Sequence, residues 1–268
     1  MARKAKTKPG KVSMQDLRKL VNQKAGRNVA HNLTEANPTE VKDWIPTGSR
    51  WLDSIICKGQ LAGIPVGKIT EIAGLTSTGK SYMAAQIAFT PAISDVEGDF
   101  NPQSSMAVKA RILAKGMSKI TLPIADKQAT LLVLNQLKDN ITSGPLARIT
   151  AMTTPYVTPG GKALVYSYSL RIWLTGRKAK SAFVLDDKGY RVGSEVKVRI
   201  EKSRFGTQGR NCAFRIMWGS VDIGVRDEES WFDAIKGSDS LTSAGAWYTL
   251  KTDNYEKKFQ PSKWVELI

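Results

Sequence analysis

A glycine-rich stretch at residues 74–81 carries the residue types that bind a polyphosphate. It reads Gly-Leu-Thr-Ser-Thr-Gly-Lys-Ser and fits the pattern G-x-x-x-x-G-K-[ST]. Glycines at the first and sixth positions permit a backbone that wraps a phosphate with its N–H groups pointing inward. The lysine reaches the β- and γ-phosphates, and the final serine hydroxyl completes the shell of a Mg²⁺ ion. The stretch predicts a site for ATP and Mg²⁺, although the loop alone does not distinguish ATP from GTP. Its residues are Gly74, Leu75, Thr76, Ser77, Thr78, Gly79, Lys80 and Ser81.

A second segment has the composition of a nucleic-acid contact. Residues 140–185 contain no Asp or Glu, and basic residues alternate there with Tyr and Trp. Basic groups neutralise phosphates, aromatic rings stack on bases, and a Gly pair lets the backbone approach closely. Trp173 is assigned to core packing instead. The residues predicted to contact DNA are Arg148, Gly160, Gly161 and Lys162.

The overall charge supports a polyanionic partner. The formal net charge is +16 over 268 residues, which favours nucleic acid first and a membrane surface second. The plain alternative is a surface whose charge serves solubility only. No apolar run is long enough to span a bilayer, and no signal peptide is expected, so a membrane partner is not predicted.

The chain is poor in residues for metal or disulfide chemistry. Its two cysteines, Cys57 and Cys212, are far apart and lack metal-type spacing, and His31 is its single histidine. A disulfide framework, a zinc site and a histidine-based catalytic triad are therefore not predicted. A reducing compartment such as the cytoplasm fits this composition.

The spacing of apolar residues predicts the strands and helices that position the phosphate-binding and DNA-binding residues. Residues 68–73 predict a strand that enters the glycine-rich turn, and a helix begins near Lys80. Residues 129–135 form a continuous apolar run, which is typical of a central parallel strand. Residues 195–202 alternate between apolar and charged side chains, as a half-buried strand does. Further strands are predicted at 163–174 and 212–218, and further helices at 13–23, 105–120 and 231–236.

The chain is expected to divide into three parts. Residues 1–44 hold a basic tail, expected to be disordered up to Lys11, and the predicted N-terminal helix. The apolar stripe of this helix is expected to dock on its own core or on a neighbouring subunit. Residues 45–235 form the core, and residues 236–268 form a short C-terminal segment.

Several motifs, in order along the chain, resemble the RecA-type DNA recombinases, in a style close to the phage UvsX-like members. They lie at residues 45–53, 63–72, 131–136, 159–164, 199–204 and 245–248. The resemblance implies an α/β fold with a RecA-like P-loop ATPase core, in which helices flank a mostly parallel sheet. It adds a small N-terminal helical segment and a short C-terminal extension. It also implies filaments on single-stranded DNA, pairing with double-stranded DNA, and the cytoplasm of a bacterium or a phage-infected cell.

The same resemblance assigns roles to individual residues. Gln136 at the end of its strand would sense the γ-phosphate, and with Lys80 it is the candidate catalytic group. Lys202 and Arg204 would reach ATP bound on the adjacent protomer.

One departure from the family is large. After Ala88 the chain passes directly to residues that resemble the segment following the family's Walker B strand. The block that carries the catalytic glutamate, an adenine-stacking aromatic and the Walker B aspartate in the family is missing. The sheet is therefore expected to lose internal strands and either to close up or to remain partly open, and the sequence does not distinguish these two forms. The nearby acids Asp95, Glu97 and Asp99 are not assigned to those roles, because no apolar strand precedes them.

The sequence therefore leaves two functions open. The first is an ATP-dependent recombinase that promotes homologous pairing and strand exchange in recombination and repair. The second is a non-hydrolysing relative that binds nucleotide and DNA and modulates or caps recombinase filaments. A third reading, an unrelated P-loop kinase for a small molecule, is disfavoured because the long acid-free loop offers no acidic catalytic groups.

Overall fold

The computed structural model describes residues 13–26, 30, 40–57, 61–89, 106–141, 149, 152–176, 182–219 and 223–267. The chain separates into two compact units, Met1–Lys42 and Asp43–Ile268, which we describe one at a time. The basic tail, His31 and the acids Asp95, Glu97 and Asp99 lie outside the described residues. Among the residues described, none of the helices is both long and apolar enough to cross a membrane.

The first unit contains the predicted N-terminal helix, α1 (Met14–Ala25). The hydroxyl of Ser13 caps it by accepting from the N–H of Asp16 at 3.1 Å. Gly26 ends it in the left-handed conformation, with φ of 64°. The stripe of Leu17 and Leu20 is about half exposed, so its docking partner stays a prediction.

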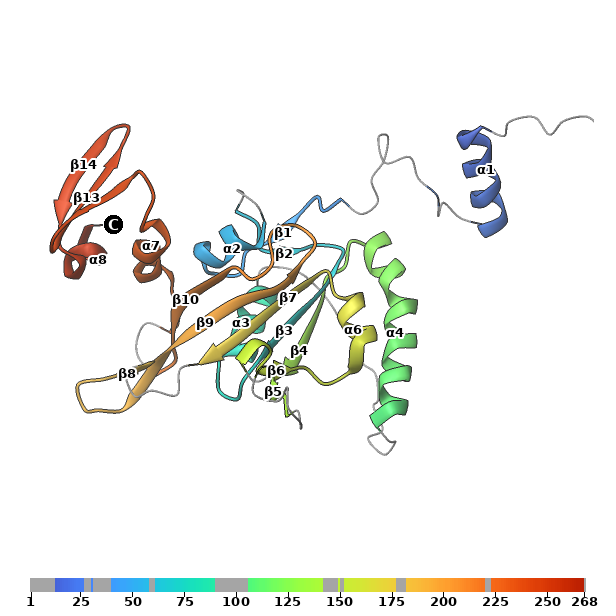
Figure 1. The fold of residues 1–268 in the computed structure, drawn as a ribbon, viewed down its shortest axis with the longest axis horizontal. Helices are drawn as coiled ribbons and strands as arrows, with labels where there is room; N and C mark the ends of the chain where they lie inside the picture. The colour runs from blue at the N-terminus through green and yellow to red at the C-terminus, as the bar shows by residue number, and fades with distance from the viewer. Residues whose placement is uncertain are drawn as a thin grey trace, which may run out of the picture. The chain divides into compact units, whose positions relative to one another are not determined.

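The second unit is built on a seven-stranded sheet (Figure 1). The order is β11-β10-β9-β7-β3-β4, and β8 pairs with β9 outside this path. Strand β3 runs parallel to β4 on one side and to β7 on the other. The remaining pairings, β7 with β9, β9 with β10, β10 with β11 and β8 with β9, are antiparallel. The strands are β3 (Ile69–Gly74), β4 (Leu131–Gln136), β7 (Leu170–Gly176), β8 (Phe183–Leu185), β9 (Arg191–Ser203), β10 (Asn211–Met217) and β11 (Gly224–Arg226).

Of the two forms expected for the shortened sheet, the described residues show the closed one. The P-loop strand β3 is paired on both sides, so the described sheet has no internal gap. Strand β4 lies at one edge of this sheet and β11 at the other, and β3 is the single described neighbour of β4. Parallel pairing is confined to β4, β3 and β7, and antiparallel strands extend the sheet away from them.

Helices cover the strands that carry the glycine-rich loop. Helices α2 (Arg50–Ile56) and α3 (Lys80–Phe89) pack Leu52 and Met83 onto Ile72, Ile172 and other residues of the main core. Helices α4 (Met106–Asp126) and α6 (Gly161–Ser167) lie side by side (Figure 1). They form a separate cluster around Met117, Leu164 and Ile69. Every residue of β3 is buried between these layers.

One prediction of secondary structure was wrong. Residues 163–174 were expected to form one strand, but Gly161–Ser167 is helix α6 and the strand begins only at Leu170. Leu164 and Tyr168 stand four residues apart, the spacing of one helical face, and both pack in the cluster around Met117. The tertiary contact with α4 thus overrides the local preference of an aromatic-rich segment for strand.

The other predicted elements are present with shifted ends. Helix α4 continues to Asp126 and includes Pro123, beyond the predicted end at residue 120. The predicted helix at 231–236 begins earlier, as α7 (Asp227–Ile235). Three consecutive acids in its first turn favour a helix start there, because they face the positive end of the helix dipole. The predicted strands at 68–73, 129–135, 195–202 and 212–218 correspond to β3, β4, β9 and β10.

The C-terminal part has a core of its own. Strands β12 (Leu241–Ala244), β13 (Trp247–Thr252) and β14 (Tyr255–Phe259) form an antiparallel sheet. Phe232 of α7 packs edge-on against Tyr248, and Trp264 of α8 (Trp264–Leu267) closes the cluster. Asp227 joins α7 to α2, because its carboxylate accepts from the backbone N–H of Arg50 at 2.8 Å. Two-stranded pieces, β1 (Trp44–Ile45) with β2 (Ile64–Pro65) and β5 (Lys138–Asp139) with β6 (Tyr156–Val157), complete the unit.

Candidate functional site

The glycine-rich loop joins the end of β3 to the start of α3. Gly74 is the last residue of β3, and Lys80 is the first residue of α3. Gly79 has φ of 78°, and a Cβ there would lie 2.6 Å from Cδ1 of Ile216. A Cβ at Gly74 would lie 2.6 Å from the carbonyl oxygen of Leu174. The tight path of this loop therefore needs glycine at both positions that the motif specifies.

Two donors hold the loop from inside. The Nζ of Lys80 donates to the carbonyl oxygen of Leu75 at 2.7 Å, and Oγ1 of Thr78 donates to the same oxygen at 2.8 Å. Burial lowers the pKa of Lys80, since desolvation disfavours the charged amine. A polyphosphate offers this amine a stronger partner than a carbonyl. The free amides at the start of the ten-residue helix α3 add a second attraction for an anion, so these residues fit a nucleotide phosphate.

Ser81 stands where a magnesium ligand is needed. It follows Lys80 in the first turn of α3 and is exposed. A hydroxyl oxygen is a ligand that Mg²⁺ accepts alongside phosphate oxygens and water. The residue type and its place beside the loop therefore fit the ion.

Residues of the loop, together with distant residues that the sequence did not single out, line a pocket of about 340 Å³. Arg191 lies with its guanidinium carbon 3.9 Å from the ring centroid of Phe183 and 5.1 Å from that of Trp218. Glu195 supplies a carboxylate to the same pocket. These residues follow the loop by more than 100 positions, and no spacing signal connects them to it. The lining consists of Leu75, Thr76, Ser77, Thr78, Gly176, Phe183, Arg191, Ser194, Glu195 and Val196.

The structure brings Gln136 to the loop. Parallel pairing of β3 with β4 sets Gln136 opposite Gly74, at the end of both strands. The next residue, Leu137, donates its N–H to the carbonyl oxygen of Gly74 at 3.0 Å. The predicted sensor and the predicted phosphate loop are thus neighbours at one edge of the sheet.

The predicted DNA contacts are described in part. Gly160 and Gly161 have φ of 112° and 78°, so the backbone turns there in a way that favours glycine. Lys162 follows in the first turn of α6 with its side chain exposed. Arg148 lies outside the described residues. Trp173, assigned to packing, is 7 % exposed in a cluster with Leu137, so that assignment is confirmed.

Lys202 and Arg204 are not at the loop of their own chain. They lie at and just after the end of β9 and bind the last carbonyls of α6. The Nζ of Lys202 donates to the Val165 oxygen at 2.6 Å, and Nη2 of Arg204 donates to the Tyr166 oxygen at 3.0 Å. Their predicted contact with nucleotide on another protomer stays a prediction.

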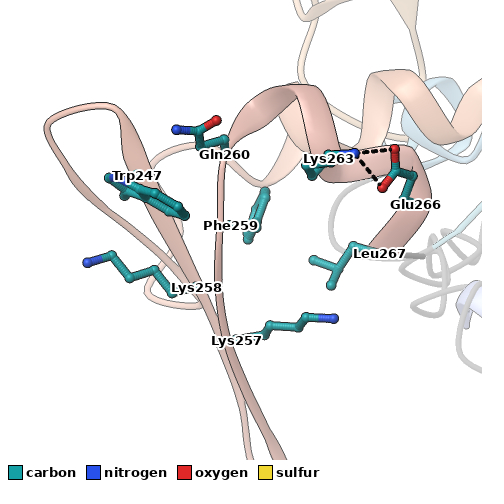
Figure 2. Close-up of a pocket in the computed structure, with 8 residues that line it drawn as sticks. All are labelled: Trp247, Lys257, Lys258, Phe259, Gln260, Lys263, Glu266 and Leu267. Carbon is teal, nitrogen blue, oxygen red and sulfur yellow. Dashed lines mark hydrogen bonds and ion pairs between the residues drawn. The ribbon is translucent and has the colours of Figure 1, made fainter.

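A separate hollow of about 410 Å³ lies on the C-terminal part (Figure 2). Trp247 lies above Lys258, with Nζ of the lysine 5.5 Å from the ring centroid. Across the hollow, Lys263 donates to both carboxylate oxygens of Glu266, at 2.7 Å and 2.9 Å. None of the predicted site residues lines it.

Comparison with known proteins identifies the core. The family model described as the RecA N-terminal domain matches residues 83–223, which is more than half of the 268 residues. This match begins after the glycine-rich loop, so the nucleotide site rests on its own motif and geometry.

Curated relatives agree with the family model. The chain is 29% identical to Protein RecA of Fusobacterium nucleatum over 160 residues, which is 59% of this chain and 38% of that protein. It is 28% identical to Protein RecA of Leptospira biflexa over 156 residues, covering 58% and 36% respectively. For Protein RecA of Saccharopolyspora erythraea the identity is 25% over 160 residues, covering 60% and 42%. The matched region thus spans about two fifths of the length of these relatives. Together with the parallel strands around the loop, these matches confirm the predicted resemblance, and the chain belongs to the RecA family.

Proposed function

We propose that this chain is a RecA-type recombinase that binds ATP, assembles as a filament on single-stranded DNA and promotes homologous pairing with double-stranded DNA. The observation that carries the proposal is the register of β3 with β4, which places Gln136 beside Gly74. A group that contacts the γ-phosphate and a loop that wraps the phosphates need this proximity. Recombination and repair in the cytoplasm of a bacterium or a phage-infected cell would be its setting.

ATP would be held by groups that the structure already brings together. Lys80 would exchange the carbonyl of Leu75 for the β- and γ-phosphates, and Ser81 would bind Mg²⁺. The ion, when bound, neutralises phosphate charge and orients the terminal phosphate. Phe183 and Arg191, in the pocket beside the loop, would contact the nucleoside.

DNA would be held at the segment that ends in Gly160, Gly161 and Lys162, with Arg148 contributing further charge. Support comes from the exposed lysine, the two positive φ angles and the net charge of +16. Phosphate neutralisation by such groups makes affinity depend steeply on salt. Lys202 and Arg204 would turn from the carbonyls of α6 to nucleotide held by the next protomer, which would make filament assembly depend on ATP.

A non-hydrolysing role is favoured by one feature of the site. Attack by water needs a carboxylate or equivalent group that orients it. Glu71, on the P-loop strand, is buried and paired with Arg171, so it is not available for that task. Glu195 also lines the pocket beside the loop, and it too has an interaction partner within the protein. We therefore infer slow hydrolysis. If turnover proves robust, Glu97 and Glu195 are the acids to replace first.

Two measurements on the purified chain test the proposal. Calorimetry should show Mg·ATP binding that Lys80→Ala abolishes or greatly weakens, because the phosphates lose their direct cationic partner. Electron microscopy should show filaments on single-stranded DNA in the presence of a non-hydrolysable ATP analogue. Unchanged ATP affinity in Lys80→Ala would refute the assignment of the loop, and absence of filaments would refute the recombinase proposal.

Turnover separates the two candidate functions. Loss of a general base typically lowers a rate by about 10² to 10⁴. Binding of ATP and DNA with turnover lower than that of a full-length RecA by such a factor would support the non-hydrolysing role. Robust DNA-stimulated turnover, lost in Glu195→Gln or Glu97→Gln, would support the complete enzyme and identify its carboxylate.

A further inference from the structure

The hollow on the C-terminal part has a basic wall that the nucleotide and DNA sites do not use. Lys257, Lys258 and Lys263 line it, and Glu266 is the one acidic residue of the lining (Figure 2). Like charges gathered around one hollow repel one another, and an anionic ligand relieves this repulsion. The volume of about 410 Å³ lies within the range of about 300–1,000 Å³ that is typical of ligand sites. The hollow therefore has the size and the charge of a binding site for an anionic group.

Another part of the lining is apolar. The side chain of Trp247 is large and apolar, yet this residue is 43% exposed. Phe259 is 4% exposed, and its ring packs against that of Trp264 with the two centroids 5.6 Å apart. Leu267 adds an aliphatic side chain to the same lining. An exposed aromatic side chain beside apolar groups that are fixed by packing is typical of a contact with another protein.

A carboxylate of the chain itself is already bound to one of the lysines. Nζ of Lys263 donates to both carboxylate oxygens of Glu266, at 2.7 Å and 2.9 Å (Figure 2). The two side chains are 62% and 68% exposed, and an ion pair with such exposure contributes little to stability. A carboxylate from another molecule can therefore replace Glu266 at little cost, and Glu266 shows the geometry with which Lys263 binds such a group.

The combination of charge and apolar surface favours a peptide over a nucleic acid. A duplex presents phosphates on its outside and keeps its bases stacked, so its apolar surfaces do not project into a hollow. A single strand could stack a base on an exposed indole. Nζ of Lys258, however, lies 5.5 Å from the ring centroid of Trp247, so a cation already lies over that ring. An acidic segment of a protein supplies both carboxylates for the lysines and an aromatic side chain for the apolar part of the lining.

We propose that this hollow binds an acidic segment of a partner protein, with an aromatic side chain of that segment in the apolar part and its carboxylates on Lys258 and Lys263. The charge complementarity between the three lysines and such a segment selects this occupant. The site goes beyond the proposed function, because it uses none of the residues assigned to ATP or DNA. The pocket beside the nucleotide loop shares none of its lining residues, so the peptide does not compete with nucleotide for them.

Fluorescence anisotropy with a synthetic peptide measures the binding. The probe is a short dye-labelled peptide in which a run of aspartates is followed by one phenylalanine. Lys258→Gln combined with Lys263→Gln should weaken its binding to the full chain about tenfold, since each exposed ion pair contributes up to about fivefold. The matched control is Lys188→Gln combined with Lys251→Gln, which removes the same charge from two exposed lysines outside the hollow. The control should change the affinity less than about twofold.

Two further changes separate the charged from the apolar contribution. Glu266→Gln should strengthen peptide binding about twofold to fivefold, because Lys263 loses the carboxylate that competes with the peptide. Replacing the phenylalanine of the peptide with serine should weaken binding about tenfold or more, since burial of an aromatic side chain contributes about that much. Circular dichroism and thermal unfolding establish that all variants of the chain fold.

Four results would overturn the inference. The first is a wild-type dissociation constant weaker than about 1 mM, the second is an equal loss in the hollow and control variants, and the third is equal binding of the serine peptide. The fourth is displacement of the peptide by DNA together with a loss of DNA affinity in the hollow variant alone, which would assign the hollow to nucleic acid. Each of these results leaves the proposed function standing. Peptide binding that persists in Lys80→Ala would support a site that is independent of the nucleotide loop.

Discussion

Gly79→Ala should damage the nucleotide loop by two separable effects. The residue has φ of 78°, a left-handed conformation that costs a residue with a Cβ about 1–2 kcal/mol. The added Cβ would also lie 2.6 Å from Cδ1 of Ile216, which is 1% exposed and cannot move freely into solvent. Overpacking of this kind costs about 1–3 kcal/mol, and a single methyl end places it in the lower part of that range. The sum is about 2–4 kcal/mol.

Gly189→Ala is the matched control. Gly189 has φ of 81°, and among the described residues no atom beyond its chain neighbours lies within 4 Å of the Cβ that alanine would add. This variant should lose only the conformational part, about 1–2 kcal/mol. For a domain of this size 1 kcal/mol shifts Tm by about 2–4 °C. The melting temperature of Gly79→Ala should therefore fall several degrees further than that of Gly189→Ala, and ATP affinity should fall in Gly79→Ala alone.

Ile216→Val completes a double-mutant cycle, because it deletes the atom that the new Cβ would meet. The next nearest atom of Ile216 is 3.9 Å away, an ordinary contact distance. Thermal unfolding of the single and double variants should show Gly79→Ala costing about 1 kcal/mol less in the Ile216→Val background. Equal costs in the two backgrounds, or equal melting temperatures for the two glycine variants, would refute the steric reasoning.

Three further predictions concern the remaining sites. Replacing both Lys202 and Arg204 with Ala should leave nucleotide affinity of the monomer largely intact and prevent ATP-dependent filaments; normal filaments in electron micrographs would contradict the proposed contact between protomers. Arg148→Ala or Lys162→Ala should lower the slope of log DNA affinity against log salt by about one, as loss of one phosphate contact does, and an unchanged slope would move the DNA site elsewhere. Burial raises the pKa of the Cys212 thiol well above its usual range, so near pH 8 a thiol reagent should modify half-buried Cys57 first; rapid modification that persists in Cys57→Ser would contradict this order.

The contiguous parts of the site were predictable from the sequence, and the parts that depend on tertiary pairing were not. The loop at 74–81 can be recognised from the sequence because all its functional groups are adjacent in the chain. Strands β3 and β4 are visible as apolar runs of strand length. The pocket that includes Phe183 and Arg191 forms only because β9 returns antiparallel to β7 and brings distant residues to the loop.

The sequence contained a sign of the buried ion pair between Glu71 and Arg171, but it did not show that these two residues are partners. Glu71 interrupts an otherwise apolar strand, and Arg171 lies in the run Leu-Arg-Ile-Trp-Leu. A charged side chain within a buried strand needs a partner of opposite charge. Each of the two residues therefore indicated that such a partner was present in the fold. The partners became identifiable only with the parallel register of β3 and β7. Helix α6 was missed for a related reason, since its packing against α4 is not encoded in local periodicity.

The pairing of β3 also sets the order in which the protein can fold during synthesis. Its two neighbours are distant in the chain, with Asn135 64 residues and Arg171 100 residues after Glu71. At about 5–20 residues per second, a ribosome needs roughly 5–20 s to reach Arg171 of β7 after it has made Glu71 of β3. Throughout that interval the apolar segment Ile69–Gly74 lacks the cover it has in the finished sheet, and the loop that follows it lacks its support. Chaperone binding during synthesis should therefore concentrate on this segment until β7 emerges.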